Sequence, residues 1–105
     1  MSENIAVLYT TVGTEAEAEK LANLAIANKM AACVNILGGG RSIYRWEEKV
    51  EQSNEYYMLF KTTAERLFAL EQFIIQNHPY DVPAILKWQC QSSLAFYDYV
   101  NALLL

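Results

Sequence analysis

The sequence predicts an α+β fold: a βαββαβ sandwich of the split-βαβ type, with an antiparallel sheet, a long central hairpin and a C-terminal helix. Three observations predict it. Apolar, β-branched runs alternate with segments of helical periodicity. Two capping boxes mark helix starts. Two long extended runs also follow each other with no helical segment between them, as a hairpin requires.

The first part of the chain contains a strand and a capped helix. Residues 5–11 are apolar and β-branched, which predicts a buried strand. Thr14 and Glu17 have the spacing of a capping box, in which each side chain bonds the other residue's backbone N–H. The helix that begins there has Leu21 and Ala25 on its core-facing side.

A long hairpin occupies the middle of the chain, with arms at residues 32–46 and 48–62. Each arm has 15 residues and would span roughly 50 Å if straight, at ~3.3 Å per residue. A compact chain of this length is only about 35 Å across, from a radius of gyration of about 13 Å. Either the glycines at 38–40 bend the ribbon, or its far end lies against a neighbouring subunit. Tyr44 and Trp46, close to the tip, favour an interface.

A second helix follows the hairpin. Thr62 and Glu65 form another capping box, which predicts that the helix begins at Thr62. We expect it to end at Asn77 or His78, because Pro79 disfavours helical geometry in the residue before it.

The last part of the chain contains a strand and a terminal helix. Residues 82–90 predict the fourth strand, fully paired only beyond Pro83, which has no N–H to donate. Ser92 or Ser93 can cap the final helix. The inward face of that helix carries four apolar residues: Phe96, Tyr97, Val100 and Leu104.

Composition describes one domain, residues 1–105, and excludes several classes of protein. A net charge of −4 without a basic stripe excludes a nucleic-acid module. No apolar run is long enough to span a membrane. The polar, acidic start does not resemble a secretory signal, so we expect a cytoplasmic protein in which Cys33 and Cys90 are reduced thiols. The apolar content of 53%, rich in aromatic residues, indicates self-association.

Few residues carry recognisable chemistry. The glycines at 38–40 are followed by neither a Lys-Ser/Thr pair nor a helix, so they predict a strand bend rather than a phosphate loop. Cys33, Cys90 and His78 lack the close spacing of zinc ligands, although thiolate plus imidazole would favour copper over magnesium or calcium. The chain has no Gly-x-Ser-x-Gly elbow, and its only histidine has no obvious carboxylate partner except Asp81. We therefore expect no enzymatic activity.

Three stretches together resemble the CutA family, which is named for divalent-cation tolerance. They are residues 31–36 (Ala-Ala-Cys-Val-Asn-Ile), residues 42–46 (Ser-Ile-Tyr-Arg-Trp) leading to Glu55 and Lys61-Thr62-Thr63, and residues 78–83 (His-Pro-Tyr-Asp-Val-Pro). The resemblance implies a ferredoxin-like homotrimer intertwined through extended strands. It also implies an association with copper and other divalent cations, and no established catalytic activity.

The resemblance assigns roles to individual residues. Cys33 and His78 match family positions proposed to bind copper. Four further residues match positions that line a cleft between subunits: Tyr44, Trp46, Lys61 and Tyr80. The chain departs from the family at three positions. It has Ala84 where a carboxylate is common, Glu48 where a glycine is common, and Tyr9 where some members have a further cysteine. Two potential metal ligands are thereby missing.

Two functional hypotheses follow. The first is a cytoplasmic, non-enzymatic homotrimer of metal-ion tolerance that sequesters or senses copper or another divalent cation at or near Cys33 and His78. Binding through a thiolate and a neutral imidazole would weaken as protons compete. The alternative is a PII-like signalling trimer that holds a small anionic ligand or a partner's loop in the cleft lined by Tyr44, Trp46 and Lys61. Neither hypothesis involves a nucleic acid or a membrane.

Overall fold

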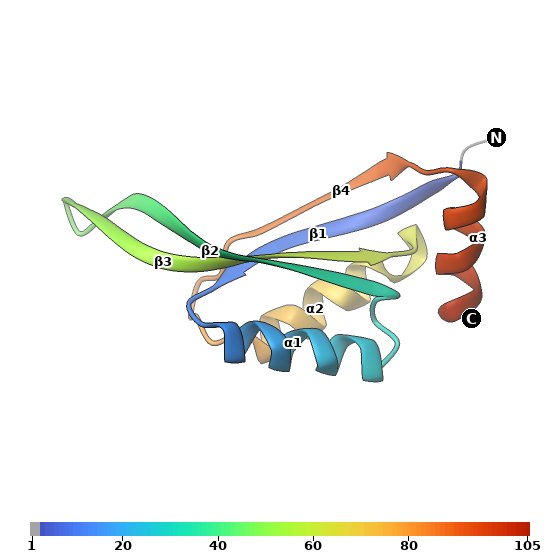
Figure 1. Ribbon diagram of the computed structural model, residues 1–105, viewed down its shortest axis with the longest axis horizontal. Coiled ribbons are helices and arrows are strands. Elements are labelled where there is room, and N and C mark those ends of the chain that lie inside the picture. The colour runs from blue at the N-terminus through green and yellow to red at the C-terminus, as the bar shows by residue number, and fades with distance from the viewer. Residues whose placement is uncertain (1–2) are drawn as a thin grey trace.

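The computed structural model describes residues 3–105 and has the predicted βαββαβ order with a terminal helix (Figure 1). The sheet has the strand order β2-β3-β1-β4, and each pair of neighbours is antiparallel. The elements are β1 (Asn4–Val12), α1 (Glu15–Ala27), β2 (Cys33–Trp46), β3 (Lys49–Thr62), the 3₁₀ turn η1 (Ala64–Arg66), α2 (Leu67–Asn77), β4 (Ile85–Gln91) and α3 (Leu94–Leu103). None of the helices in this described part is long and apolar enough to cross a membrane.

The main core lies between the sheet and helices α1 and α2, which cover one face of it (Figure 1). Strand side chains alternate between the two faces of a sheet, so every second residue of β1 and β3 points to these helices. Leu8, Met58 and Phe60 are fully buried there. They pack with Leu70 of α2 and with Leu21 of α1, which was predicted to face the core. Both long helices thus lie on the same face of the sheet, as the predicted split-βαβ arrangement requires.

The opposite face of the sheet, which we call the open face, carries the other set of alternating side chains. Helix α3 covers only one end of it, where Ile5 packs with Val100 and Leu104. Elsewhere large apolar side chains remain accessible: Leu37 is 51% exposed, Leu86 59% and Trp88 43%. The pairings Leu37↔Tyr57, Leu86↔Tyr9 and Trp88↔Val7 place all three on this face. One chain therefore leaves an apolar surface uncovered.

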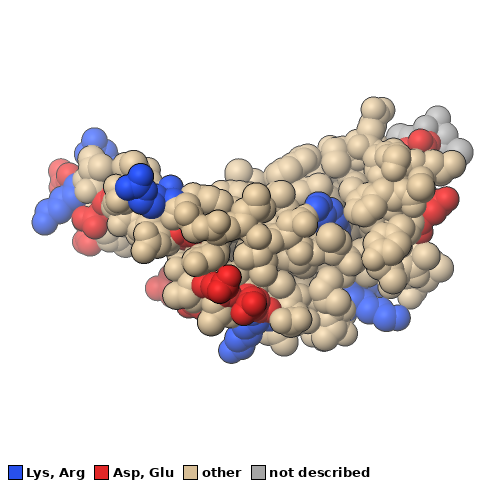
Figure 2. All heavy atoms as spheres, viewed as in Figure 1, with Lys and Arg blue, Asp and Glu red and all other residues tan. Residues whose placement is uncertain are grey.

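The hairpin bends and then projects from the body, as Figure 1 shows at the left. The register of β2 against β3 shifts between Leu37 and Gly40, so the glycine bend predicted from the sequence is confirmed. Beyond the bend the ribbon forms an arm, residues 41–53, and the molecule measures 47 Å along its longest axis against 26 and 22 Å across. Figure 2 shows charged side chains gathered on this arm. A two-residue turn closes it, with φ of 49° at Glu47 and 66° at Glu48, as tight hairpin turns require.

Local capping signals predicted two of the helix starts correctly. The Thr14 hydroxyl accepts the backbone N–H of Glu17 at 3.1 Å, and Ser93, one of the two predicted caps, accepts that of Phe96 at 3.3 Å. Helix α2 ends at Asn77, and His78 turns to an extended ψ of 140°, as its position before Pro79 predicted.

Two predicted boundaries were wrong. Thr62 does not cap the second helix: it is fully buried and its hydroxyl donates to the Met30 carbonyl at 2.8 Å. Thr63 is the cap, accepting the Arg66 N–H at 3.2 Å at the start of η1. The fourth strand begins at Ile85 rather than at residue 82, because the ladder with β1 starts only at the Ile85↔Thr10 pair.

Candidate functional site

A polar network lies where β1 ends, and His78 is at its centre. The extended geometry of His78 after α2 turns its ring toward β1. Its Nε2 lies 3.0 Å from the Thr10 hydroxyl and 2.9 Å from the Thr11 carbonyl oxygen. Through these contacts His78 holds the loop after α2 against the end of β1.

The hydrogen bonds assign the tautomer of His78. The backbone N–H of Tyr80 donates to Nδ1 at 3.1 Å, so Nδ1 carries a lone pair and the proton is on Nε2. The Nε2–H faces the Thr11 carbonyl, which only accepts. Burial lowers the pKa of His78, opposed by its bond to Thr11 and by the charges of Glu17 and Glu55. The imidazole is therefore neutral, and both of its nitrogens are engaged.

Glu55 completes the network and was not among the predicted site residues. Its side chain is buried, with the residue only 7% exposed. The Thr11 hydroxyl donates to Oε1 at 3.2 Å, and the Tyr80 hydroxyl donates to Oε2 at 3.0 Å. Burial, followed by the bond to Glu55, raises the pKa of Tyr80 to about 12. Both recorded donors to this carboxylate are neutral hydroxyls.

The four predicted cleft residues do not all meet within one chain, although Tyr44 lies close enough to Tyr80 to contribute to the raised pKa of Tyr80. Tyr80 contacts Glu55, and Tyr44 lies on the arm with its hydroxyl 2.7 Å from that of Ser53. Trp46 is 61% exposed at the end of β2, next to the tip of the arm. Lys61 lies on the open face of β3, opposite Cys33 on one side and Val7 on the other. Any cleft that includes all four must be formed by more than one copy.

Cys33 and His78 are also apart. Cys33 is opposite Lys61 in the pairing of β2 with β3, and Lys61 is opposite Val7 in the pairing of β3 with β1. His78 instead contacts β1 three to four residues further on, at Thr10 and Thr11. The separation is about 10–13 Å along the strands, at ~3.3 Å per residue, and about 10 Å across two strand spacings. The Cys33 side chain is on the open face, while the His78 ring bonds the Thr10 hydroxyl on the helix-covered face. The expected joint site is thus not formed within one chain.

The described residues do not form a metal centre in one chain. No group of three or more His, Cys, Asp or Glu side chains among residues 3–105 is placed to hold an ion. Cys33 and Cys90 are free thiols on the two outer strands, about 14 Å apart across three strand spacings, too far for a disulfide. His78 has no lone pair to offer in its present bonding. A complete shell would need ligands from more than one copy.

The three residues at which the chain departs from the family pattern can be located in the structure. Glu48 is in the arm turn with its φ of 66°, a conformation that glycine adopts more easily. Ala84 is exposed just before β4, and Tyr9 is half-buried on the open face between Leu59 and Leu86.

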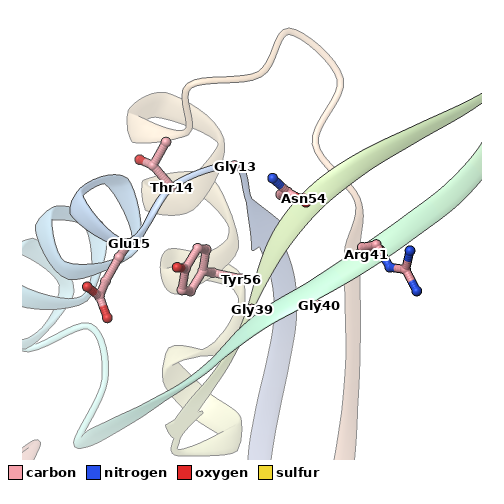
Figure 3. A pocket seen from close by; sticks show the side chains of 8 residues that line it. All are labelled: Gly13, Thr14, Glu15, Gly39, Gly40, Arg41, Asn54 and Tyr56. Atoms are coloured by element: carbon pink, nitrogen blue, oxygen red, sulfur yellow. The ribbon is translucent and has the colours of Figure 1, made fainter.

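A cavity of about 500 Å³ lies between the start of α1 and the glycine bend (Figure 3). Its lining consists of Gly13, Thr14, Glu15, Gly39, Gly40, Arg41, Asn54 and Tyr56. In Figure 3 the Arg41 side chain points away from Tyr56, while Glu15 adds a negative charge to the lining. Thr14 already caps the N–H of Glu17. The cavity therefore has no converging positive groups, and it does not favour an anionic ligand.

Comparisons with known proteins agree on one family. The sequence model for the CutA1 divalent ion tolerance protein matches residues 6–102. A divalent-cation tolerance protein CutA of Yersinia pestis is 42% identical over 83 residues, which cover 79% of this chain and 70% of the relative.

Solved structures are similar over the full length. The crystal structure of the divalent ion tolerance protein CutA1 from Ehrlichia chaffeensis superposes with a TM-score of 0.95 at 33% identity, covering 100% of this chain and 98% of that one. The structure of CutA from Synechococcus elongatus gives a TM-score of 0.94 at 38% identity, with coverage of 100% and 95%.

Proposed function

The chain belongs to the CutA1 divalent ion tolerance family, and from this premise we propose that it acts in divalent-cation tolerance as a non-enzymatic homotrimer. The observation that carries the proposal is the open face. A single chain leaves Leu37, Leu86 and Trp88 accessible on one side of its sheet and extends an arm past its own body. An uncovered apolar surface of this kind marks a contact with another protein surface.

The arm supplies the second support for self-association. Trp46 is 61% exposed, and Ile43 and Val50 are each 69% exposed, so apolar side chains alternate with the charged residues of the ribbon. Aromatic residues such as Trp46 are enriched at the centres of interfaces, where charged residues are depleted. Size measurement tests the assembly: deleting residues 41–50 should convert trimers to monomers, and an unchanged number of subunits would contradict the proposal.

The cation in this proposal is copper or another divalent ion, and Cys33 is the residue on which binding would depend. Its half-buried thiol lies on the open face, where copies of the chain would meet. Thiolates select soft ions such as copper. His78 was the other predicted ligand, but its two nitrogens are committed to Tyr80 and Thr11. The remaining ligands would therefore come from other copies.

Native mass spectrometry and calorimetry test the role of Cys33. Cys33→Ser should abolish stoichiometric copper binding while leaving the number of subunits unchanged. Cys90→Ser is the matched control, because Cys90 is also half-buried but packs with the α3 cluster. His78→Ala should leave binding largely intact. Full copper binding by Cys33→Ser would refute the assignment.

A further inference from the structure

Glu55 is a buried carboxylate without a cation in its own chain. The salt bridge among residues 3–105 joins Lys87 of β4 to Glu71 of α2 on the helix-covered face, whereas Glu55 is on the open face. The recorded partners of Glu55 are the hydroxyls of Thr11 and Tyr80. A desolvated carboxylate that lacks a positive partner is costly, and the cost grows if another chain covers the open face.

One basic side chain likewise has no partner of opposite charge in its own chain. The chain has eight Lys and Arg residues. Six of them are exposed, including Lys87, which pairs with Glu71, and the half-buried Arg66 donates to the Leu104 carbonyl. Lys61 is the remaining one. It is half-buried on the open face, and no acceptor for its ammonium is recorded within the described part of the chain.

Glu55 and Lys61 cannot meet within one chain. Both are on β3 and on the same face, because they are six residues apart in a strand with a side-chain period of two. That separation is ~20 Å at ~3.3 Å per residue, whereas an ion pair needs its nitrogen and oxygen within about 4 Å. The open face thus has an unpaired acid at one end and an unpaired base at the other.

We propose that the Glu55 carboxylate of one copy pairs with the Lys61 ammonium of a neighbouring copy, so that the polar network at the end of β1 is completed only by assembly. The inference rests on the proposed self-association and adds a specific contact to it. A cyclic trimer brings different patches of neighbouring copies together, which an acid end and a base end require. Burying both charges unpaired would oppose assembly, whereas pairing them fixes the register of the copies.

Zero-length carbodiimide coupling gives a direct test, because it joins a carboxylate and an amine only when they are in contact. Treated protein is digested and searched by mass spectrometry for a peptide containing residue 55 joined to one containing residue 61. The two groups are ~20 Å apart in one chain, so such a link can form only between copies. We expect this product from native protein and not from Glu55→Gln. Its absence under conditions that couple Lys87 to Glu71 would overturn the pair.

A charge-reversal cycle measures the energetic coupling. Glu55→Lys or Lys61→Glu alone should raise the dissociation constant of the assembly by about 100-fold or more, as is usual when one member of a desolvated charged pair is lost. The double variant restores opposite charges and should recover most of that loss. Reversal of Glu19 and Lys20, both exposed on α1, is the matched control and should change assembly little. If reversal prevents folding, the milder Glu55→Gln removes the charge and still offers one amide oxygen to accept a hydroxyl and one amide group to donate to the other.

The outcomes separate the two proposals. A monomeric native protein at micromolar concentration would refute self-association and the ion pair with it. A native trimer in which the double reversal is as weak as the two single reversals combined would refute the pair alone and leave the assembly standing.

Discussion

Tyr80→Phe removes one of the two recorded donors to the buried Glu55 carboxylate while keeping the aromatic ring. The lost bond is 3.0 Å long and joins the phenol to Glu55 Oε2. Hydrogen bonds to charged groups contribute about 1.5–3 kcal/mol when shielded from water. Tyr80 is 36% exposed, so solvent screens part of this, and we expect a loss of about 1 kcal/mol in the free energy of unfolding at pH 7.

The pH dependence makes the same prediction more specific. The pKa of Tyr80 is raised to about 12 in the folded protein from its ordinary value of 10.0. The folded state therefore holds the phenol proton more tightly than the unfolded chain does. This contribution is fully present below pH 10 and is lost as pH rises toward 12. Native protein should lose stability over that range more steeply than Tyr80→Phe does.

Urea unfolding at fixed protein concentration, at pH 7 and at steps from pH 9 to 11.5, measures both effects. Tyr99→Phe is the matched control, since Tyr99 is 53% exposed and no hydrogen bond of its hydroxyl is recorded in the described chain. It should stay within about 0.5 kcal/mol of native protein. An alkaline slope for Tyr80→Phe equal to that of native protein would refute the link between the phenol and Glu55.

Three further predictions concern other contacts. The folded pKa of His78 is lowered, so stability is highest above its ordinary value of 6.5 and should fall as pH drops below that value. His78→Gln should flatten this fall in urea titrations between pH 7.5 and 4.5, and an unchanged slope would contradict the assignment. Thr62→Val keeps the buried shape but leaves the Met30 carbonyl without its 2.8 Å donor, so thermal unfolding should report a loss of about 1–3 kcal/mol. In Gly40→Ala the new methyl group would overlap the Tyr57 hydroxyl, which should cost about 1–3 kcal/mol by the same assay, whereas native stability would show that the arm bend adjusts freely.

The order of elements could be predicted from the sequence because its signals are local. Thr14 and Ser93 cap their helices through residues three positions away, and Pro79 ends α2 through its own ring. The wrong prediction of Thr62 as the cap shows the limit of such local signals. Both residues are buried threonines in extended backbone, and the Met30 carbonyl, distant in the sequence, accepts from the Thr62 hydroxyl and leaves Thr63 to cap the turn.

The site was harder to predict because it depends on strand pairing. An acid at position 55, within a run of alternating strand residues, gives no local sign that Thr11 and Tyr80 enclose it. Its spacing of two from Tyr57 was the available signal, since it places Glu55 on the same face as Tyr57 and opposite to the face of Phe60. The separation of Cys33 from His78 likewise requires the register of three strands, which residue spacing alone does not contain.

The strand order β2-β3-β1-β4 leaves two free edges, one long and one short, whose outward N–H and C=O groups have no strand beside them in the same chain (Figure 1). Edges of this kind recruit further chains, and recruitment stops only when a ring closes on itself. A copy whose arm is shortened by an internal deletion would keep its β4 edge but would have no complete β2 edge. Mixed with intact copies, it should occupy a place in the proposed ring that it cannot close, so a minority of arm-deleted copies would disable many intact subunits.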